Sequence, residues 1–383
     1  MVRFGDLYAL PSRNGLTRPS AARGVGYRMA AMGEIFASDF VGDSEMDRVR
    51  LNSRELSAMM LNNNDLLFAR QSLVLSGAGK CAIVRDLAEP TTFESHLIRV
   101  RLNEQKANPL FYMYYFRSPL SPMKSIVQQG VQAGIRGSDL AELQVHCPDK
   151  MIQDKIADIL FDYDAAIANC RKQIVLLEEA AMRLYREWFG EGKGEKKRIG
   201  DVCECVLGGT PNRAKAEYWG GNVAWINSGK VNELRIVEPS EYITDLGLKK
   251  SAAKVMPRHT TVLAITGATL GQVSLLEIDS AANQSVVGVL ENDVIHYEFI
   301  YPMIVSNIRK LIMHQTGGAQ QHICKDDVLN FEVLIPSKSE LNKYGNICRP
   351  IFERVSNLFF TIRSLTEAQD RLLPKLMKGE IEV

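Results

Sequence analysis

The sequence predicts an α+β protein made as a tandem duplication, in which two globular α/β domains are each followed by one long helix. Two observations predict this fold. A hydrophobic stripe with helical spacing occurs twice at an offset of 188 residues, and strand-like segments separated by glycine-rich turns precede each stripe. The predicted boundaries are a first domain at 1–148, a first helix at 149–190, a linker at 191–198, a second domain at 199–336 and a second helix at 337–383.

Apolar residues of the first stripe recur every three or four positions between Ile152 and Trp188. A helix of roughly 40 residues is roughly 60 Å long. The second stripe keeps the same register, and its single polar exception is Gln369. The residues predicted to face a partner helix are Ile156, Ile159, Tyr163, Ile167, Ile174, Leu177, Leu184, Ile347, Ile351, Val355, Leu358, Ile362, Leu365 and Leu372.

Stripes of this length favour pairing of the two helices as an antiparallel coiled coil. The alternative is that each stripe docks only on its own domain. An antiparallel pair would relate the two domains by a pseudo-twofold axis, and the length of the helices would fix their separation.

The domains are expected to be rich in strands, with short helices between the late strands. The expected helices are 109–117 and 299–312. The expected strands are 65–69, 80–85, 95–102 and 143–147 in the first domain, and 222–227, 261–266, 272–277, 285–290 and 330–335 in the second.

The composition is that of an ordinary soluble globular protein, with 46% hydrophobic and 24% charged residues. No apolar run approaches the roughly 20 residues of a membrane span, and Arg3 and Asp6 interrupt the start where a signal peptide would be apolar. We therefore expect a cytoplasmic protein with no membrane partner. The seven cysteines form no C-x-x-C pair, which predicts neither a disulfide framework nor a metal site.

Catalytic motifs fail on inspection. Residues 108–111 (NPLF) lack the second proline of the N-P-P-[FY] strip of adenine methyltransferases, and residues 76–80 lack the ends of a phosphate loop. No carboxylate pair or Ser/His/Asp group recurs in both modules. The sequence therefore predicts a non-catalytic chain without a cofactor.

The charge is unevenly distributed along the chain. Its net value is only +1, but residues 1–33 hold five arginines against one acid, whereas 199–336 hold eleven basic and fifteen acidic residues. In the second domain, residues 208–229 mix polar and basic side chains with aromatics and glycines, which suits a loop along a nucleic-acid backbone. For Trp219 and Trp225 in this stretch, packing is the favoured role.

The same block (GGTPNR, YWGG, WINSG) resembles the specificity subunits of type I restriction-modification systems. Further matching blocks are TGATLG at 266–271, NQS at 283–285, GGAQQ at 317–321 and the ending LLPKLMKGEI at 372–381, with looser versions in the first module. The resemblance implies two target recognition domains that each read half of a split, asymmetric double-stranded DNA sequence, and a helix pair that sets the spacer. It also implies two methyltransferase subunits and, for cleavage, restriction subunits, which carry the cofactor chemistry.

Side chains in the divergent loops are the expected DNA contacts. These are Arg13, Asn14, Arg18, Arg23, Arg28, Arg70, Gln132 and Arg136 in the first module, and Thr210, Asn212, Arg213, Lys215, Lys230, Thr269, Gln320 and Gln321 in the second. Two other functions stay open at this stage: a duplicated coiled-coil adaptor that bridges protein partners without DNA, and an orphan antagonist of a DNA-modifying system.

Overall fold

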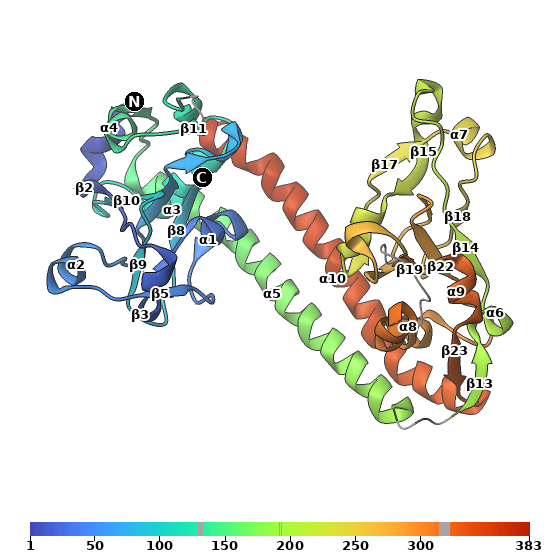
Figure 1. Ribbon diagram of the computed structural model, residues 1–383. Helices are drawn as coiled ribbons and strands as arrows, with labels where there is room; N and C mark the ends of the chain where they lie inside the picture. Colours follow the sequence, from blue (N-terminus) through green and yellow to red (C-terminus); the bar gives the residue numbers. More distant parts are fainter. Residues whose placement is uncertain (129–132, 191, 193, 314–321) are drawn as a thin grey trace. The chain divides into compact units, whose positions relative to one another are not determined.

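The computed structural model describes residues 1–383 apart from 129–132, 191, 193 and 314–321 (Figure 1). The described residues form two compact units, of which unit 1 comprises 1–166 and 365–383 and unit 2 comprises 167–364. The α-helices are α1 (Met32–Ala37), α2 (Ser53–Ala58), α3 (Pro109–Arg117), α4 (Gly137–Glu142), α5 (Lys150–Phe189), α6 (Ile199–Val202), α7 (Asp245–Lys249), α8 (Tyr297–Met313), α9 (Lys325–Asn330) and α10 (Lys338–Lys378).

The domain of unit 1 contains a five-stranded sheet of order β2-β10-β6-β8-β4 and a three-stranded sheet of order β5-β3-β9. A short pair, β1 with β12, joins its first and last strands, and β7 pairs with β11. The strands are β1 (Val2–Arg3), β2 (Tyr8–Asn14), β3 (Arg23–Ala30), β4 (Phe40–Val41), β5 (Asp47–Val49), β6 (Leu66–Ala69), β7 (Gln71–Ser72), β8 (Cys81–Val84), β9 (Thr91–Phe93), β10 (Leu97–Leu102), β11 (Ala133–Gly134) and β12 (Gln144–Val145).

The domain of unit 2 repeats this topology. Its five-stranded sheet has the order β14-β22-β19-β20-β16, and its second sheet, β17-β15-β21-β18, has one additional strand. The pairs β4·β8 and β3·β9 are parallel, as are their counterparts β16·β20 and β15·β21. The strands are β13 (Glu195–Arg198), β14 (Cys205–Leu207), β15 (Trp219–Ile226), β16 (Arg235–Ile236), β17 (Glu241–Ile243), β18 (Val255–Met256), β19 (Thr261–Ala264), β20 (Val273–Leu276), β21 (Ser280–Ala282), β22 (Val286–Val289) and β23 (Glu332–Ile335).

The predicted linker at 191–198 is partly wrong, because it contains β13. This strand pairs antiparallel with β23 through Glu195↔Ile335 to Arg198↔Glu332. Residues 195–198 therefore belong to the second domain. Backbone hydrogen bonds join β13 to β23, the strand that leads into α10.

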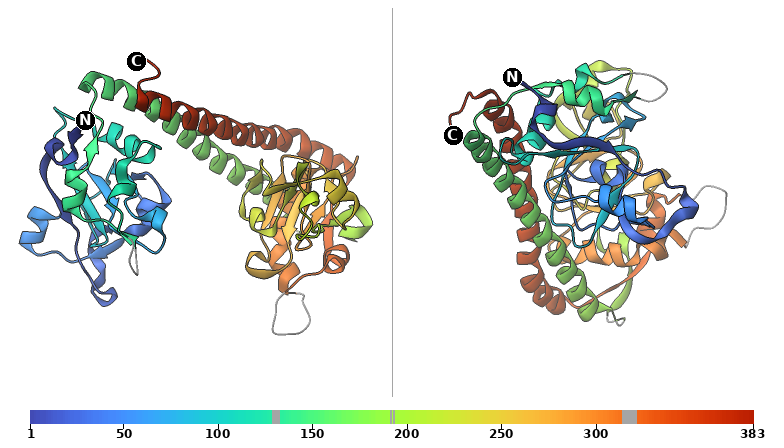
Figure 2. Two further views of the ribbon diagram at one scale, coloured as in Figure 1. Left: turned by 90° about the horizontal axis from the view of Figure 1, so that it is seen from above. Right: turned by 90° about the vertical axis from the view of Figure 1, so that its left-hand side faces the viewer.

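The long helices α5 and α10 lie side by side and antiparallel within each unit (Figure 2). In unit 2 the guanidinium of Arg354 donates to Gln173 at 3.0 Å, and the rings of Tyr185 and Tyr344 lie 6.5 Å apart further along. In unit 1 the amide of Gln369 donates to the carbonyl oxygen of Leu160 at 3.0 Å. The two predicted long helices and their antiparallel pairing are confirmed.

Most residues of the predicted stripe are buried or partly buried, and Ile347 is the exception among them. Ile347 is 47% exposed, because the buried face of α10 in this region runs through Tyr344, Cys348 and Phe352, each four residues from the next. Ile351 is only partly buried beside this face. Further along, the predicted residues Val355 and Leu358 pack with Ile174 in an apolar cluster between the helices.

Candidate nucleic-acid interface

Two segments of the first domain meet at the turn formed by residues 94–96, between β9 and β10. The segment after β2 reaches this turn through Ser95 N–H, which donates to the carbonyl oxygen of Leu16 at 2.9 Å. The loop after β6 reaches it through Arg70 N–H, which donates to the carbonyl oxygen of His96 at 2.7 Å. The imidazole of His96 also lies 3.1 Å from the side-chain oxygen of Gln71.

The second domain forms the same junction at residues 283–285. Gly209 N–H donates to the carbonyl oxygen of Ala282 at 2.7 Å, and Ile265 N–H donates to that of Ser285 at 2.9 Å. The hydroxyl of Thr210 bonds to the side chain of Gln284. The structure therefore gathers polar loops at equivalent places in both domains, and we call each set the loop junction.

The first glycine of each loop is required by close packing against the turn. A Cβ added to Gly15 would lie 2.3 Å from the carbonyl oxygens of Phe93 and Glu94. A Cβ added to Gly208 would lie 2.1 Å from the carbonyl oxygen of Asn283. Because these atoms belong to the backbone, neither site can accept a side chain without moving a strand end.

Several predicted arginines of the first domain lie at this junction but pair with acids. Arg18 donates to Glu55 of α2 at 2.6 Å, and this hydrogen bond holds the pKa of the Glu55 carboxyl below its usual value. Arg23 lies 3.1 Å from Asp47 and 3.7 Å from Glu94.

Other predicted contacts of this domain are more open to solvent. Arg13 and Asn14 are exposed at the end of β2, and Arg136 is exposed at the start of α4. Arg70 is partly buried, and its guanidinium donates to the carbonyl oxygen of Ser95 at 3.4 Å.

Arg28 is not available for DNA, and its prediction is corrected. Its side chain is almost fully buried, lies 3.2 Å from Asp43, and donates to the carbonyl oxygens of Gly42 and Ser44. These acceptors satisfy its charge inside the domain. We therefore remove Arg28 from the proposed contacts.

In the second domain Arg213 forms an exposed bidentate pair with Glu241, with distances of 2.7 and 2.8 Å. This pairing holds the pKa of the Glu241 carboxyl below its usual value. The guanidinium also lies 3.6 Å from the ring centre of Trp219. Trp225 is buried, and its indole N–H donates to the carbonyl oxygen of Gly209 at 3.1 Å, so the expected packing role is confirmed.

The remaining predicted side chains, including Gln132 of the first domain, divide into three groups. Asn212 and Lys215 are exposed in the loop that follows Gly208, where the Asn212 side chain accepts from Ala214 N–H. Lys230 pairs with Glu233 at 2.7 Å, and its 3-10 turn Ser228–Asn232 contacts the turn Gly267–Thr269. The predicted contacts outside the described residues are Gln132, Gln320 and Gln321.

Two features of the junction were missed from the sequence. Glu55 and Glu241 pair with candidate arginines, and His96 with Gln71 joins the loop after β6 to the turn. The sequence shows ESH at 94–96 and NQS at 283–285, at matching positions of the two modules. It did not show that these turns lie beside the other loops.

A buried charged cluster, also missed, joins the second domain to both long helices. Arg235 at the start of β16 is fully buried and contacts Glu178 of α5 and Glu277. Glu277 accepts from the hydroxyl of Ser356 in α10 at 2.7 Å. Burial raises the pKa of the Glu178 carboxyl, although the nearby Arg235 charge opposes this shift.

Unit 1 has an analogous connection made from different residues. Arg117, at the end of α3, donates to the side-chain oxygen of Gln369 in α10 at 2.7 Å. It also lies 3.9 Å from Asp164 of α5, whose carboxylate accepts from Tyr114. The polar exception in the second stripe therefore takes part in connecting the helix pair to the domain.

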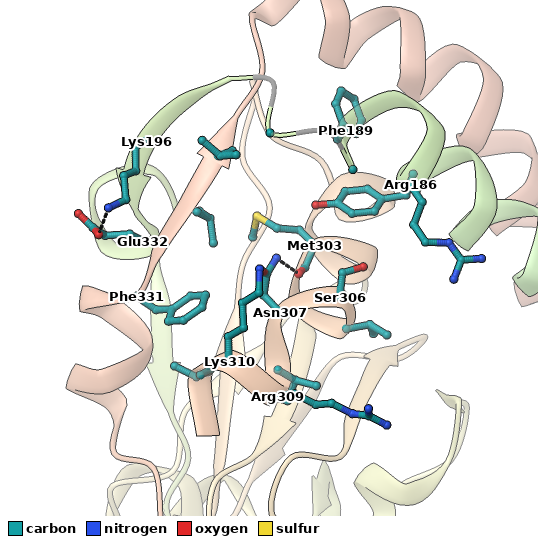
Figure 3. A pocket seen from close by; sticks show the side chains of 18 of the residues that line it. Arg186, Phe189, Lys196, Met303, Ser306, Asn307, Arg309, Lys310, Phe331 and Glu332 are labelled. Atoms are coloured by element: carbon teal, nitrogen blue, oxygen red, sulfur yellow. Dashed lines mark hydrogen bonds and ion pairs between the residues drawn. The ribbon is translucent and has the colours of Figure 1, made fainter. Parts of the chain in front are cut away.

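A hollow of about 1410 Å3 lies in unit 2 between the end of α5, α8 and the β13·β23 pair (Figure 3). Arg186, Arg309 and Lys310 line it together with the apolar Phe189 and Met303. None of the predicted DNA contacts that the structure describes lines it.

The rejected NPLF motif at 108–111 has a structural role. Asn108 caps α3 by accepting from Leu110 N–H and Phe111 N–H, at 2.9 and 3.2 Å. All seven cysteines are free thiols. Across the described residues there is no group of three or more ligand-type side chains that could hold a metal ion. Nor does any helix in the described part of the chain have the length and apolar character to cross a membrane.

Two related domains, each followed by one of two paired helices, make up the architecture that comparisons with other proteins assign to a known class of protein. The model of the type I restriction modification DNA specificity domain matches residues 36–179 and 192–365, so the chain belongs to this family. It is accordingly a non-catalytic specificity subunit of the type I restriction-modification class.

The specificity subunit of the MjaIX enzyme from Methanocaldococcus jannaschii is 24% identical over 72% of this chain and 69% of its own length. That of the EcoR124I/EcoR124II enzyme from Escherichia coli is 24% identical over 64% of this chain and 65% of its own. The crystal structure of the S subunit of a type I restriction-modification system from M. genitalium has a TM-score of 0.62 at 14% identity. The match covers 98% of this chain and 95% of the M. genitalium chain, and it shows that the two chains share a fold.

Proposed function

We propose that this chain reads a bipartite, asymmetric DNA target, one half with each loop junction. The supporting observation is that one junction is made twice on one topology with different side chains. Thr210, Asn212 and Arg213 occupy the loop that in the first domain carries Arg18. Two related but unlike surfaces suit two unlike half-sites.

The proposed contacts are exposed donors that can exchange their present partners for DNA. The Arg213–Glu241 pair is open to solvent, where an ion pair contributes little to stability, so a phosphate or base edge can compete for the guanidinium. The same holds less strongly for the more buried Arg18–Glu55 pair. Arg13, Asn14, Arg136, Asn212 and Lys215 complete the exposed set.

We further propose that the chain docks two methyltransferase subunits and, in a cleaving complex, restriction subunits, and that it acts in the cytoplasm. Val175 and Leu176 of α5 are exposed on the side away from α10, at 55% and 66%, and Ile347 of α10 is exposed at 47%. Exposed apolar side chains on long helices are suited to protein contacts.

A random-oligonucleotide selection on the co-purified methyltransferase complex tests DNA reading. We expect a consensus of two unlike half-sites separated by a gap of fixed length. A pool with no consensus would instead support the protein-bridging adaptor. A chain that inhibits methylation of its partner's DNA without selecting a sequence would support the antagonist.

A further inference from the structure

The loop after β6 carries an exposed apolar tip that its counterpart in the second domain lacks. Nine residues separate Ala69 from Gly79, whose N–H donates to the Ala69 carbonyl oxygen at 2.8 Å. Only six separate Ala264 from Gly271, which make the equivalent bond at 2.9 Å. The longer loop contains Leu73, Val74 and Leu75, which are 86%, 60% and 55% exposed.

The base of this loop is fixed, so the tip is held out from the domain. Gln71 and Ser72 pair with β11, and the Ser72 hydroxyl accepts from Val74 N–H at 3.2 Å. Gly77 is buried at the other side of the loop, where an added Cβ would lie 2.3 Å from the Ser72 hydroxyl and 3.0 Å from the ring of Phe36. Phe36 itself is 42% exposed and extends the apolar surface.

The tip adjoins the loop junction. Gln71 contacts His96 of the central turn, and Arg70 at the start of the loop bonds to the same turn through Ser95 and His96. The patch formed by Phe36 and residues 73–75 therefore continues the surface that we propose for the first half-site. Three consecutive apolar side chains that are exposed add nothing to the hydrophobic core, and such runs indicate a binding surface.

We propose that residues 73–75, with Leu73 foremost, insert between base pairs of the first half-site and unstack one base step. This proposal rests on the proposed function. Apolar wedges of this kind enter base steps from the minor groove and kink the duplex, and pyrimidine–purine steps open most easily. In the second domain Leu270 of the shorter loop is partly buried against the core, so this loop, residues 265–270, presents no equivalent wedge.

The experiment uses the methyltransferase complex and its selected duplex, with 2-aminopurine placed at successive positions of both half-sites. Fluorescence is expected to rise on binding at one step of the first half-site. Leu73→Ser should abolish this rise and weaken binding about tenfold to hundredfold, whereas Leu73→Met should retain both. Val294→Ser removes an exposed apolar side chain of the second domain and serves as the control.

The outcomes separate this inference from the proposed function. A bipartite consensus with no Leu73-dependent rise overturns the wedge alone, and the absence of any consensus overturns both. Unstacking caused by the partner subunits would persist in Leu73→Ser, and would also overturn the wedge. If Leu73→Ser instead reduces co-purification of the methyltransferase subunits at unchanged DNA affinity, the tip contacts protein and the proposal is wrong.

Discussion

Replacing Arg235 by methionine should destabilise unit 2 by about 3 kcal/mol, the low end for breaking a buried ion pair. Methionine fills much of the same space beside Tyr301 and Phe352, whose ring centres lie 4.5 and 5.3 Å from the guanidinium. Glu277 keeps Ser356 as a hydrogen-bond partner. The unpaired charge is therefore mainly that of Glu178.

The loss of unfolding free energy caused by Arg235→Met should become smaller as the pH falls. Burial already raises the pKa of Glu178, and without Arg235 nothing opposes that shift, so the folded variant holds this proton more tightly than the unfolded chain does. Its folding takes up a proton, and stability rises as the pH is lowered from neutral through the raised pKa towards the ordinary value. The wild type should show this dependence more weakly.

Hydrogen exchange of the β19 and β22 amides follows unit 2 separately from unit 1 in the full-length chain. For a unit of this size, 3 kcal/mol corresponds to a fall in midpoint of about 6–12 °C. Arg213→Met, which breaks an exposed bidentate pair, should cost less than about 1 kcal/mol. Adding Glu178→Leu to Arg235→Met should recover stability. An Arg235→Met loss no larger than that of Arg213→Met, or one independent of pH, would refute the reasoning.

Three further predictions concern the junctions, the helix pair and the charge. Gly15→Ala should displace the first loop junction and reduce recognition of the first half-site only, which competition with duplexes mutated in one half-site would measure. The control is Gly33→Ala, because a Cβ added there meets nothing within 4 Å, and this variant should bind DNA normally. Gln369→Ala removes a hydrogen-bond acceptor of Arg117 and the donor to the Leu160 carbonyl oxygen, so it should lower the free energy of unfolding of unit 1 by about 1–3 kcal/mol. An unchanged unfolding midpoint of unit 1 would argue against that role. Since many arginines here are paired with acids, log Kd should depend less steeply on log salt concentration for the isolated chain than for the methyltransferase complex, and equal slopes in a salt titration would disprove this division of charge.

The long helices could be predicted from the sequence because a buried face recurs at fixed spacing and is local information. The exposure of Ile347 shows the limit of hydrophobic spacing as a signal, because Ile347 and Cys348 are both apolar and adjacent. Only the three-dimensional packing of the cluster that contains Phe299 decides that Cys348 is the buried one. The strands β2 and β3 were missed because their sequences do not alternate between apolar and polar residues: β2 contains a proline, and β3 contains two glycines.

The candidate site was harder to predict because pairing between distant residues decides which charges remain available. Arg28 and Arg213 look alike in the sequence, but Arg28 is enclosed by carbonyl groups and an aspartate whereas Arg213 lies on an aromatic ring in solvent. The exposure of residues 73–75 was equally invisible, because a run of Leu and Val ordinarily indicates a strand.

The β13·β23 pair has a consequence for how such a chain can vary. It places the entry and exit of the second domain on neighbouring strands, directly before α10, and β1·β12 does the same for the first domain before α5. Because backbone pairing fixes both chain ends of each domain, we expect a domain of the same topology but different sequence to fit between the same ends. Under the proposed function, an exchange confined to 199–331 would therefore change the half-site read by the second domain and leave that of the first domain unchanged.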